Sequence, residues 1–178
     1  MTLEELEKRL RTLEDTEEIK KLQYRYIDCL NQCKWDDIAD CFAVDGICEV
    51  LPGPRKGKAA ITKSFKEEIS FAHIGEEGLY CIHPIISIEG DKAKGNWLMY
   101  VQPAKKHGKP RELPQIPSPE LLARGREGYG VAEQLPDWVQ GYYNNEYVRE
   151  NGEWKIKWLK WYPRLMSPTK DTGDTVKK

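Results

Sequence analysis

The side chains of this chain that can exchange a proton near neutral pH are its three histidines, at positions 73, 83 and 107. An unperturbed imidazole has a pKa of about 6.5, so it can act as either acid or base. Elimination of water from a carbon skeleton needs such a group, because one proton leaves carbon and another joins the departing hydroxyl. The separation of the three histidines matches no metal-ligand pattern, which favours a site without metal or other cofactor. His107 lies in the charged run KKHGK and is expected to face solvent.

A tyrosine lies on the apolar face of the helix predicted between residues 17 and 42. Ile19, Leu22, Tyr26 and Leu30 recur at helical spacing and form one stripe. A phenol on a face that should meet the core indicates the lining of a cavity, where its hydroxyl can donate to a developing oxyanion. The alternative is a core aromatic residue whose hydroxyl bonds a backbone carbonyl.

Other polar residues have both a chemical and a structural interpretation. His83 precedes Pro84, so it can belong to a site or cap exposed backbone at an irregularity in a strand. Arg164 can hold an anionic or carbonyl group through its fork of donors, or form a surface ion pair. Asp36 and Asp37 are expected to cap a second, short helix rather than to catalyse.

The N-terminal helical pattern divides into an arm and a main helix. Leucines at positions 3, 6, 10 and 13 have the a/d spacing of a coiled coil for less than two heptads. This is too short for a stable coiled coil alone, and suits an arm that packs on the domain or on a neighbouring subunit. Asp15 and Glu18 have the spacing of a capping box, which predicts that the main helix begins near Asp15.

The rest of the chain is predicted to form one strand, one helix and two hairpins. The strand spans 46–51, the helix spans 58–71, and the hairpins pair 79–89 with 92–102 and 139–150 with 153–162. The second hairpin has Asn-Gly at its turn, a strong hairpin signal. Helices followed by strands indicate an α+β domain with helices on one face of an antiparallel sheet. If that sheet is strongly curved, it forms a cone with a pocket at its mouth.

Length and composition narrow the class of protein. A chain of 178 residues suits one domain, and 28 basic against 29 acidic residues give no bulk charge for nucleic acid or membrane binding. No apolar run is long enough to span a membrane. Five cysteines, mostly in predicted helices and strands, indicate buried free thiols and a reducing cytoplasm. The proline-rich residues 103–137 predict an irregular insert, and 167–178 a flexible tail.

Three segments resemble the nuclear-transport-factor-2-like superfamily, specifically its SnoaL-like branch of polyketide cyclases and dehydratases. They are IKKLQYRYIDCLNQCKWDDIADCFAVDG, HPIISIEGDKAKGNW and YYNNEYVRENGEWKIKWLKW. Within that branch the chain is most similar to the bacterial bile-acid dehydratases, through MTLEELEKRL, IKKLQYRYIDCL and WYPR. The resemblance implies a single SnoaL-like domain over 1–178, an α+β cone in which a curved antiparallel sheet wraps around helices (a SnoaL-like α+β barrel). It also implies a homo-oligomer, a dimer or trimer formed through the outer face of the sheet.

The resemblance implies a site as well. Tyr26 matches the family's tyrosine and Arg164 its arginine, while the histidine falls on His83 or, less well, on His73. Asn31 stands where the family has an aspartate, so it can orient a ring nitrogen but supplies no negative charge. We therefore expect Tyr26 and His83 to form an acid/base pair, with Asn31 orienting and Arg164 anchoring the substrate.

The expected ligand is a small molecule. Six tryptophans and nine tyrosines are more than a core needs and indicate a lined pocket or an interface. The side chains expected to bind substrate are His73, Trp97, Tyr100, Tyr143, Tyr147 and Trp161. The expected function is a cofactor-independent, dehydratase-like lyase or isomerase acting on a hydrophobic oxygenated compound, steroid-like or aromatic. The alternative is a SnoaL-like protein that binds a small molecule without turnover, or a structural subunit.

Overall fold

The computed structural model of the chain describes residues 1–70, 73, 77–103 and 138–167. Three α-helices and two irregular helical turns precede most of the sheet: α1 Leu3–Asn31, α2 Trp35–Ile38, η1 Ala39–Cys41, α3 Lys58–Ser64 and η2 Phe65–Ile69. The strands are β1 Phe42–Glu49, β2 Arg55–Lys56, β3 Gly78–Glu89, β4 Lys92–Gln102, β5 Val139–Glu150 and β6 Glu153–Met166.

Helix α1 is one continuous helix, so the prediction of a separate start near Asp15 is wrong. The helix begins at Leu3 with a capping box in which Glu5 N–H donates to the Thr2 hydroxyl and Thr2 N–H donates to the Glu5 carboxylate. No glycine or proline interrupts the segment after that cap, so the helix continues to Asn31. Asp15 is instead buried, and its carboxylate accepts hydrogen bonds from Arg149 and, at 3.1 Å, from Trp154 Nε1.

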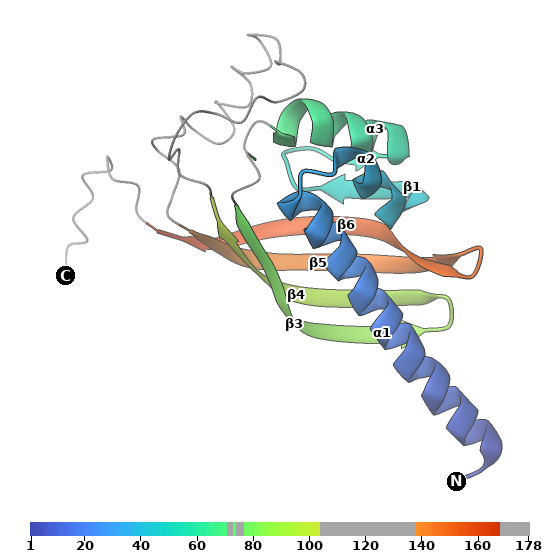
Figure 1. The fold of residues 1–178 in the computed structure, drawn as a ribbon. Helices are drawn as coiled ribbons and strands as arrows, with labels where there is room; N and C mark the ends of the chain where they lie inside the picture. The colour runs from blue at the N-terminus through green and yellow to red at the C-terminus, as the bar shows by residue number, and fades with distance from the viewer. Residues whose placement is uncertain (71–72, 74–76, 104–137, 168–178) are drawn as a thin grey trace, which may run out of the picture.

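The six strands form one sheet in the order β2-β1-β6-β5-β4-β3. All pairs are antiparallel except β1 with β6, which is parallel. The helices α1, α2 and α3 lie on one face of the curved, unclosed sheet (Figure 1). The predicted α+β cone is therefore confirmed. The parallel pair and the short strand β2 were not predicted, because local patterning does not report which distant strand becomes a neighbour.

Both predicted hairpins are confirmed. The loop between β5 and β6 has two residues, Asn151 and Gly152, with φ of 52° and 84°, as a type I′ turn requires. Strand β1 begins at Phe42, four residues before the predicted Gly46, because Phe42 pairs with Ile156 of β6 and is fully buried. The predicted helix from 58 is α3, extended to Ile69 by one turn of π-helix.

The core lies between the helices and the inner face of the sheet, the face that meets α1. Its α1 members include Ile19, Leu22, Tyr26 and Leu30, the stripe that the sequence predicts. Cysteines 29, 41, 48 and 81 are buried thiols, also as predicted. Burial raises the pKa of the thiols at 41, 48 and 81 to about 12, so they remain protonated and pack as small apolar groups.

Some predictions concern residues outside the described part of the chain. The proline-rich insert at 103–137 falls there except for Pro103, as does His107, and so does the tail beyond Ser167. Among the helices that the structure describes, none is both long and apolar enough to cross a membrane.

Candidate functional site

Tyr26 lies in the middle of an aromatic cluster on the inner face of the sheet. Its ring centroid is 5.9 Å from that of Phe42, 6.3 Å from Phe65 and 6.0 Å from Tyr143, all nearly perpendicular. The buried hydroxyl has no hydrogen bond of ordinary geometry to the residues that the structure describes. Burial, followed by the neighbouring Tyr143 phenol, raises the pKa of Tyr26 well above its usual value. The Tyr26 phenol therefore stays protonated.

His73 lies at one end of the same cluster. Its ring is 5.7 Å from that of Trp35, which stacks on Phe65 with centroids 6.4 Å apart, and Phe65 in turn contacts Tyr26. Rings thus lie side by side without a break from His73 to Tyr26. Aromatic pairs at these distances and angles are favourable, so the contacts between these rings stabilise their packing.

A buried carboxylate accompanies this imidazole. Glu77 Oε2 lies 3.8 Å from His73 Nδ1, and the two side chains are 2% and 14% exposed. The separation is that of an ion-pair contact and is longer than a hydrogen bond. Burial lowers the pKa of His73 below its usual 6.5, and the charge of Glu77 opposes this shift in part. Near pH 7 the His73 imidazole is neutral and can accept a proton, with a carboxylate beside it to stabilise the resulting imidazolium.

Asn31 joins the end of α1 to the start of β3. Its Nδ2 donates to the Leu79 carbonyl at 3.0 Å, and the Leu79 N–H donates to Asn31 Oδ1 at 2.9 Å. Both ends of the amide are therefore used by one backbone residue. The sequence prediction assigned Asn31 to orient a histidine or a substrate hydroxyl, whereas the structure shows it holding the helix against the sheet.

His83 and Arg164 lie away from Tyr26. His83 is exposed in β3, with φ of 51°, where the register to β4 shifts between Ile82 and Ile85. Arg164 is exposed near the end of β6 and donates to the Tyr142 hydroxyl at 3.2 Å. Because Tyr142 alternates with the inward-facing Tyr143, this contact lies on the outer face of the sheet. The structure therefore does not bring together the four residues that were expected to form the site, which are Tyr26, His83, Asn31 and Arg164.

Two of the predicted substrate-binding residues, Trp97 and Tyr147, belong to a buried hydrogen-bonded network under α1. Trp97 Nε1 donates to the Tyr147 hydroxyl at 2.8 Å, and that hydroxyl donates to Gln23 Oε1 at 2.9 Å. Asn145 Nδ2 donates to Gln23 Oε1 at 2.8 Å. Gly95 leaves room for this contact, since a Cβ there would lie 2.9 Å from both the Trp97 and Tyr147 side chains. These hydrogen bonds join Gln23 of α1 to β5 and help to hold the helix on the sheet. Asn145 Oδ1 is buried and has no hydrogen-bond partner among the described residues.

Tyr143 contacts Tyr26 and Trp161 contacts Tyr143, whereas Tyr100 lies on the opposite face of the sheet. The Trp161 ring lies 5.3 Å from that of Tyr143. A glycine at 141 makes this possible, because a Cβ there would lie 2.6 Å from the Trp161 ring. Tyr100 alternates with the buried Trp97 along β4, and its ring packs on Trp138 at 6.2 Å. Tyr100 therefore lies on the outer face.

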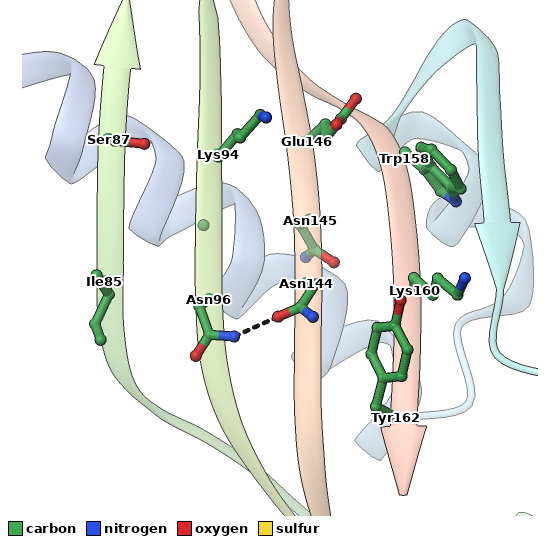
Figure 2. A pocket seen from close by; sticks show the side chains of 11 residues that line it. Ile85, Ser87, Lys94, Asn96, Asn144, Asn145, Glu146, Trp158, Lys160 and Tyr162 are labelled. Atoms are coloured by element: carbon green, nitrogen blue, oxygen red, sulfur yellow. Dashed lines mark hydrogen bonds between the residues drawn. The ribbon is translucent and has the colours of Figure 1, made fainter.

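The outer face carries a hollow of about 420 Å³ across β3 to β6 (Figure 2). Its apolar wall comes from Ile85, Trp158 and Tyr162, and its charged rim includes Lys94, Glu146 and Lys160. No histidine or cysteine lines it. It can therefore bind a surface or a ligand, but it lacks a group that ordinarily titrates near neutrality.

Sequence reasoning missed Glu77, Trp35 and Phe65 as members of the site. A signal for Glu77 was present, since it precedes the inward-facing Leu79 by two residues and strand alternation gives both the same side. No comparable signal placed Trp35 beside His73, because that contact joins a helix to an irregular segment. Within the part of the chain that is described, no group of three or more His, Cys, Asp or Glu residues could hold a metal ion.

Comparison with known proteins agrees with this architecture. No curated protein matches the chain at a significant level. It is similar in structure to an NTF2-like protein with a cystatin-like fold from Novosphingobium aromaticivorans (TM-score 0.65, 19% identity, 90% of this chain and 88% of that one). A candidate scytalone dehydratase from the same organism is also similar in structure (TM-score 0.65, 16% identity, 88% of this chain and 89% of that one). So is LinA (TM-score 0.67, 13% identity, 92% of this chain and 95% of that one). At these identities the likeness shows the fold alone. The SnoaL-like domain family matches residues 11–160, so the chain belongs to that family.

Proposed function

We propose that this protein is a cofactor-independent lyase or isomerase of the dehydratase type, acting on a hydrophobic oxygenated small molecule. The observation that carries the proposal is the buried His73–Glu77 pair at the end of an aromatic row. A neutral imidazole beside a carboxylate is what proton abstraction from carbon near neutral pH requires. Membership of the SnoaL-like family and likeness to a candidate scytalone dehydratase support the same reaction class.

In the proposed reaction His73 takes a proton from a carbon next to the carbon that carries the hydroxyl. The electron pair of the broken C–H bond forms the double bond, and the hydroxyl leaves with a proton returned by the imidazolium, giving one water molecule. Glu77 stabilises the imidazolium in between through its negative charge, which Asn31 was expected not to supply. The Tyr26 phenol is the proposed donor to a substrate oxygen on which negative charge develops.

The proposed substrate is steroid-like or aromatic. The row from Trp35 through Phe65 to Tyr26 offers ring faces and edges, which suit a flat apolar skeleton. The resemblance to the bile-acid dehydratases inferred from the sequence, which the comparisons with known proteins do not show, favours the steroid-like class. The likeness in fold to a candidate scytalone dehydratase favours the aromatic one.

A ligand screen followed by turnover tests this proposal. Bile acids, steroid enones, aryl-propanoids and phenols of polyketide type are assayed first for a rise in melting temperature of the wild-type protein. Compounds that bind are then followed for loss of 18 mass units by mass spectrometry, 18 being about the mass of one water. Binding without any turnover would support the alternative of a non-catalytic binding protein.

Two histidine variants separate the proposed base from the one expected from sequence. His73→Gln should lower kcat by about 10²- to 10⁴-fold, because it removes the base. His83→Gln should leave kcat within about twofold, since that side chain is exposed on β3. Tyr26→Phe should lower kcat less than His73→Gln does. Loss of activity in His83→Gln with activity retained in His73→Gln would reverse the assignment.

A further inference from the structure

The N-terminal third of α1 carries an apolar stripe that its own domain leaves exposed. Leu3, Leu6, Leu10 and Leu13 are 73, 45, 57 and 65% exposed. They lie on one side of the helix, because their spacing of three and four residues follows the helical turn. Residues 1–14, which we name the arm, extend beyond the edge of the sheet (Figure 1). Contact with the described part of the domain begins only at Asp15, which is buried against Arg149 and Trp154.

Two of the possible roles for the arm that the sequence left open can now be separated. The arm does not pack on its own domain within the described residues, since every residue from 1 to 14 is exposed. The arm is the exposed beginning of the continuous helix Leu3–Asn31, and a stripe of four leucines at this spacing is typical of a helix that packs against another one. Of the two roles, packing on a neighbouring chain is the one that the exposure of the arm favours.

The charges beside the stripe indicate which neighbour fits. With Leu3 and Leu10 at heptad position a, Glu7 and Glu14 fall at position e and Arg9 falls at position g. In two parallel copies, position g of one helix faces the following position e of the other, which places Arg9 beside Glu14 of the second copy. In two antiparallel copies, e faces e and g faces g, so glutamates would meet glutamates and arginines would meet arginines.

These side chains are available for such contacts. No ion pair engages Glu7, Arg9 or Glu14 among the residues that the structure describes, and Arg9 Nη1 contacts only the Met1 sulfur, at 3.3 Å. The other charged side chains of the arm, those of Glu4, Glu5, Lys8 and Arg11, occupy positions b, c and f, away from the stripe. The arm is therefore self-complementary in parallel and not in antiparallel orientation.

We propose that the arms of two copies of this chain pair in parallel through the stripe Leu3, Leu6, Leu10 and Leu13, with Arg9 of each copy beside Glu14 of the other. Two heptads are too short to hold a dimer alone, so the folded domains that follow Asp15 add contacts once the arms align them. This interface is independent of the proposed reaction, because its residues lie far along α1 from Tyr26.

The mass of the full chain in solution, measured by sedimentation, tests the pairing. Wild type should sediment as a dimer, and Leu6→Lys combined with Leu10→Lys should sediment as a monomer with an unchanged far-ultraviolet circular dichroism spectrum. Leu165→Lys is the matched control, since Leu165 is an exposed leucine outside the arm, 48% accessible, and its replacement should leave the dimer intact. A monomeric wild type, or a dimer that survives the arm variant, would overturn the proposal.

The orientation has its own test by charge exchange. Arg9→Glu should raise the dimer dissociation constant by about three- to tenfold, because it places two glutamates side by side at each g–e′ contact. Adding Glu14→Arg to the same chain should restore the wild-type constant. An unchanged dissociation constant for Arg9→Glu alone would indicate antiparallel arms, because like charges then face each other at g–g′ both before and after the change. Failure of the double variant to recover would show that a different surface faces Arg9. Either result contradicts the parallel pair.

Discussion

Alternate residues of one strand lie in two different environments in this protein. Tyr143 and Tyr147 of β5 face the helices and are buried, whereas Tyr142 and Glu146, which precede them directly, face outward. Tyr143 packs against the ring of Tyr26, and the Tyr147 hydroxyl donates to Gln23. Burial raises the pKa of Tyr147 well above its usual value. The outward set contacts long cationic side chains, as Tyr142 does with Arg164.

The same difference separates the two histidines that the sequence could not rank. His73 lies against Trp35 with a buried carboxylate beside it, whereas His83 lies exposed on β3. A low dielectric environment and a fixed charged partner shift the pKa of an imidazole, whereas exposure to solvent does not. Position relative to the sheet, rather than residue type, decides which of the two is a candidate for catalysis.

The largest effect should come from removing a buried ring of the inner face. Trp97→Ala should lower the free energy of unfolding by about 3–5 kcal/mol, because it leaves a cavity and removes one of the hydrogen bonds to the Tyr147 hydroxyl. Tyr162→Ala, on the outer face and 41% exposed, should cost less than about 1 kcal/mol. Urea denaturation monitored by fluorescence gives both values. Equal losses for the two variants would mean that the faces do not differ as described.

A smaller effect should follow from restoring the family's carboxylate. Asn31→Asp should lower the free energy of unfolding by about 1–3 kcal/mol, since the carboxylate accepts from the Leu79 N–H but meets the Leu79 carbonyl without a donor. Asn144→Asp, at an exposed position of β5, is the control and should be nearly neutral. A stabilised Asn31→Asp variant would indicate that the amide is not the clamp described above.

The finest test is the pH dependence that His73 imposes. Because its pKa in the folded state lies below the 6.5 of the unfolded chain, the unfolded state binds more protons between these two values. The contribution to stability is therefore complete above pH 6.5 and is lost as the pH falls through the folded pKa. Glu77→Gln removes the charge that raises this pKa, so the pKa should fall further in that variant.

Nuclear magnetic resonance of the histidine rings measures this pKa in the full chain without any substrate. His73→Gln identifies the signal by deleting it. In wild type the signal should titrate below pH 6.5, and in Glu77→Gln at a lower pH still. A His73 signal that titrates above pH 6.5, or one that Glu77→Gln moves upward, would contradict the burial and charge assigned to this pair.

Most of the fold follows from local sequence patterns. The stripe through Ile19, Leu22 and Tyr26 predicts the buried face of α1, and Asn151-Gly152 predicts the turn between β5 and β6. These predictions succeed because hydrophobic period and turn chemistry act over a few residues. The parallel pairing of β1 with β6 and the continuity of α1 past Asp15 were missed, since each depends on residues distant in sequence or on competition between two caps.

For the site, the amino-acid sequence determined which residues could do chemistry and that Tyr26 faces inward. Only the tertiary structure decided that His73 meets Trp35 and Glu77, that Asn31 holds Leu79, and that Arg164 lies outside. The physical reason is the two-residue period of a strand. A register shift of one residue, such as that at Ile82–Ile85 in β3 or that at Pro163–Leu165 in β6, sends a side chain to the other face. No local pattern reports where such a shift occurs.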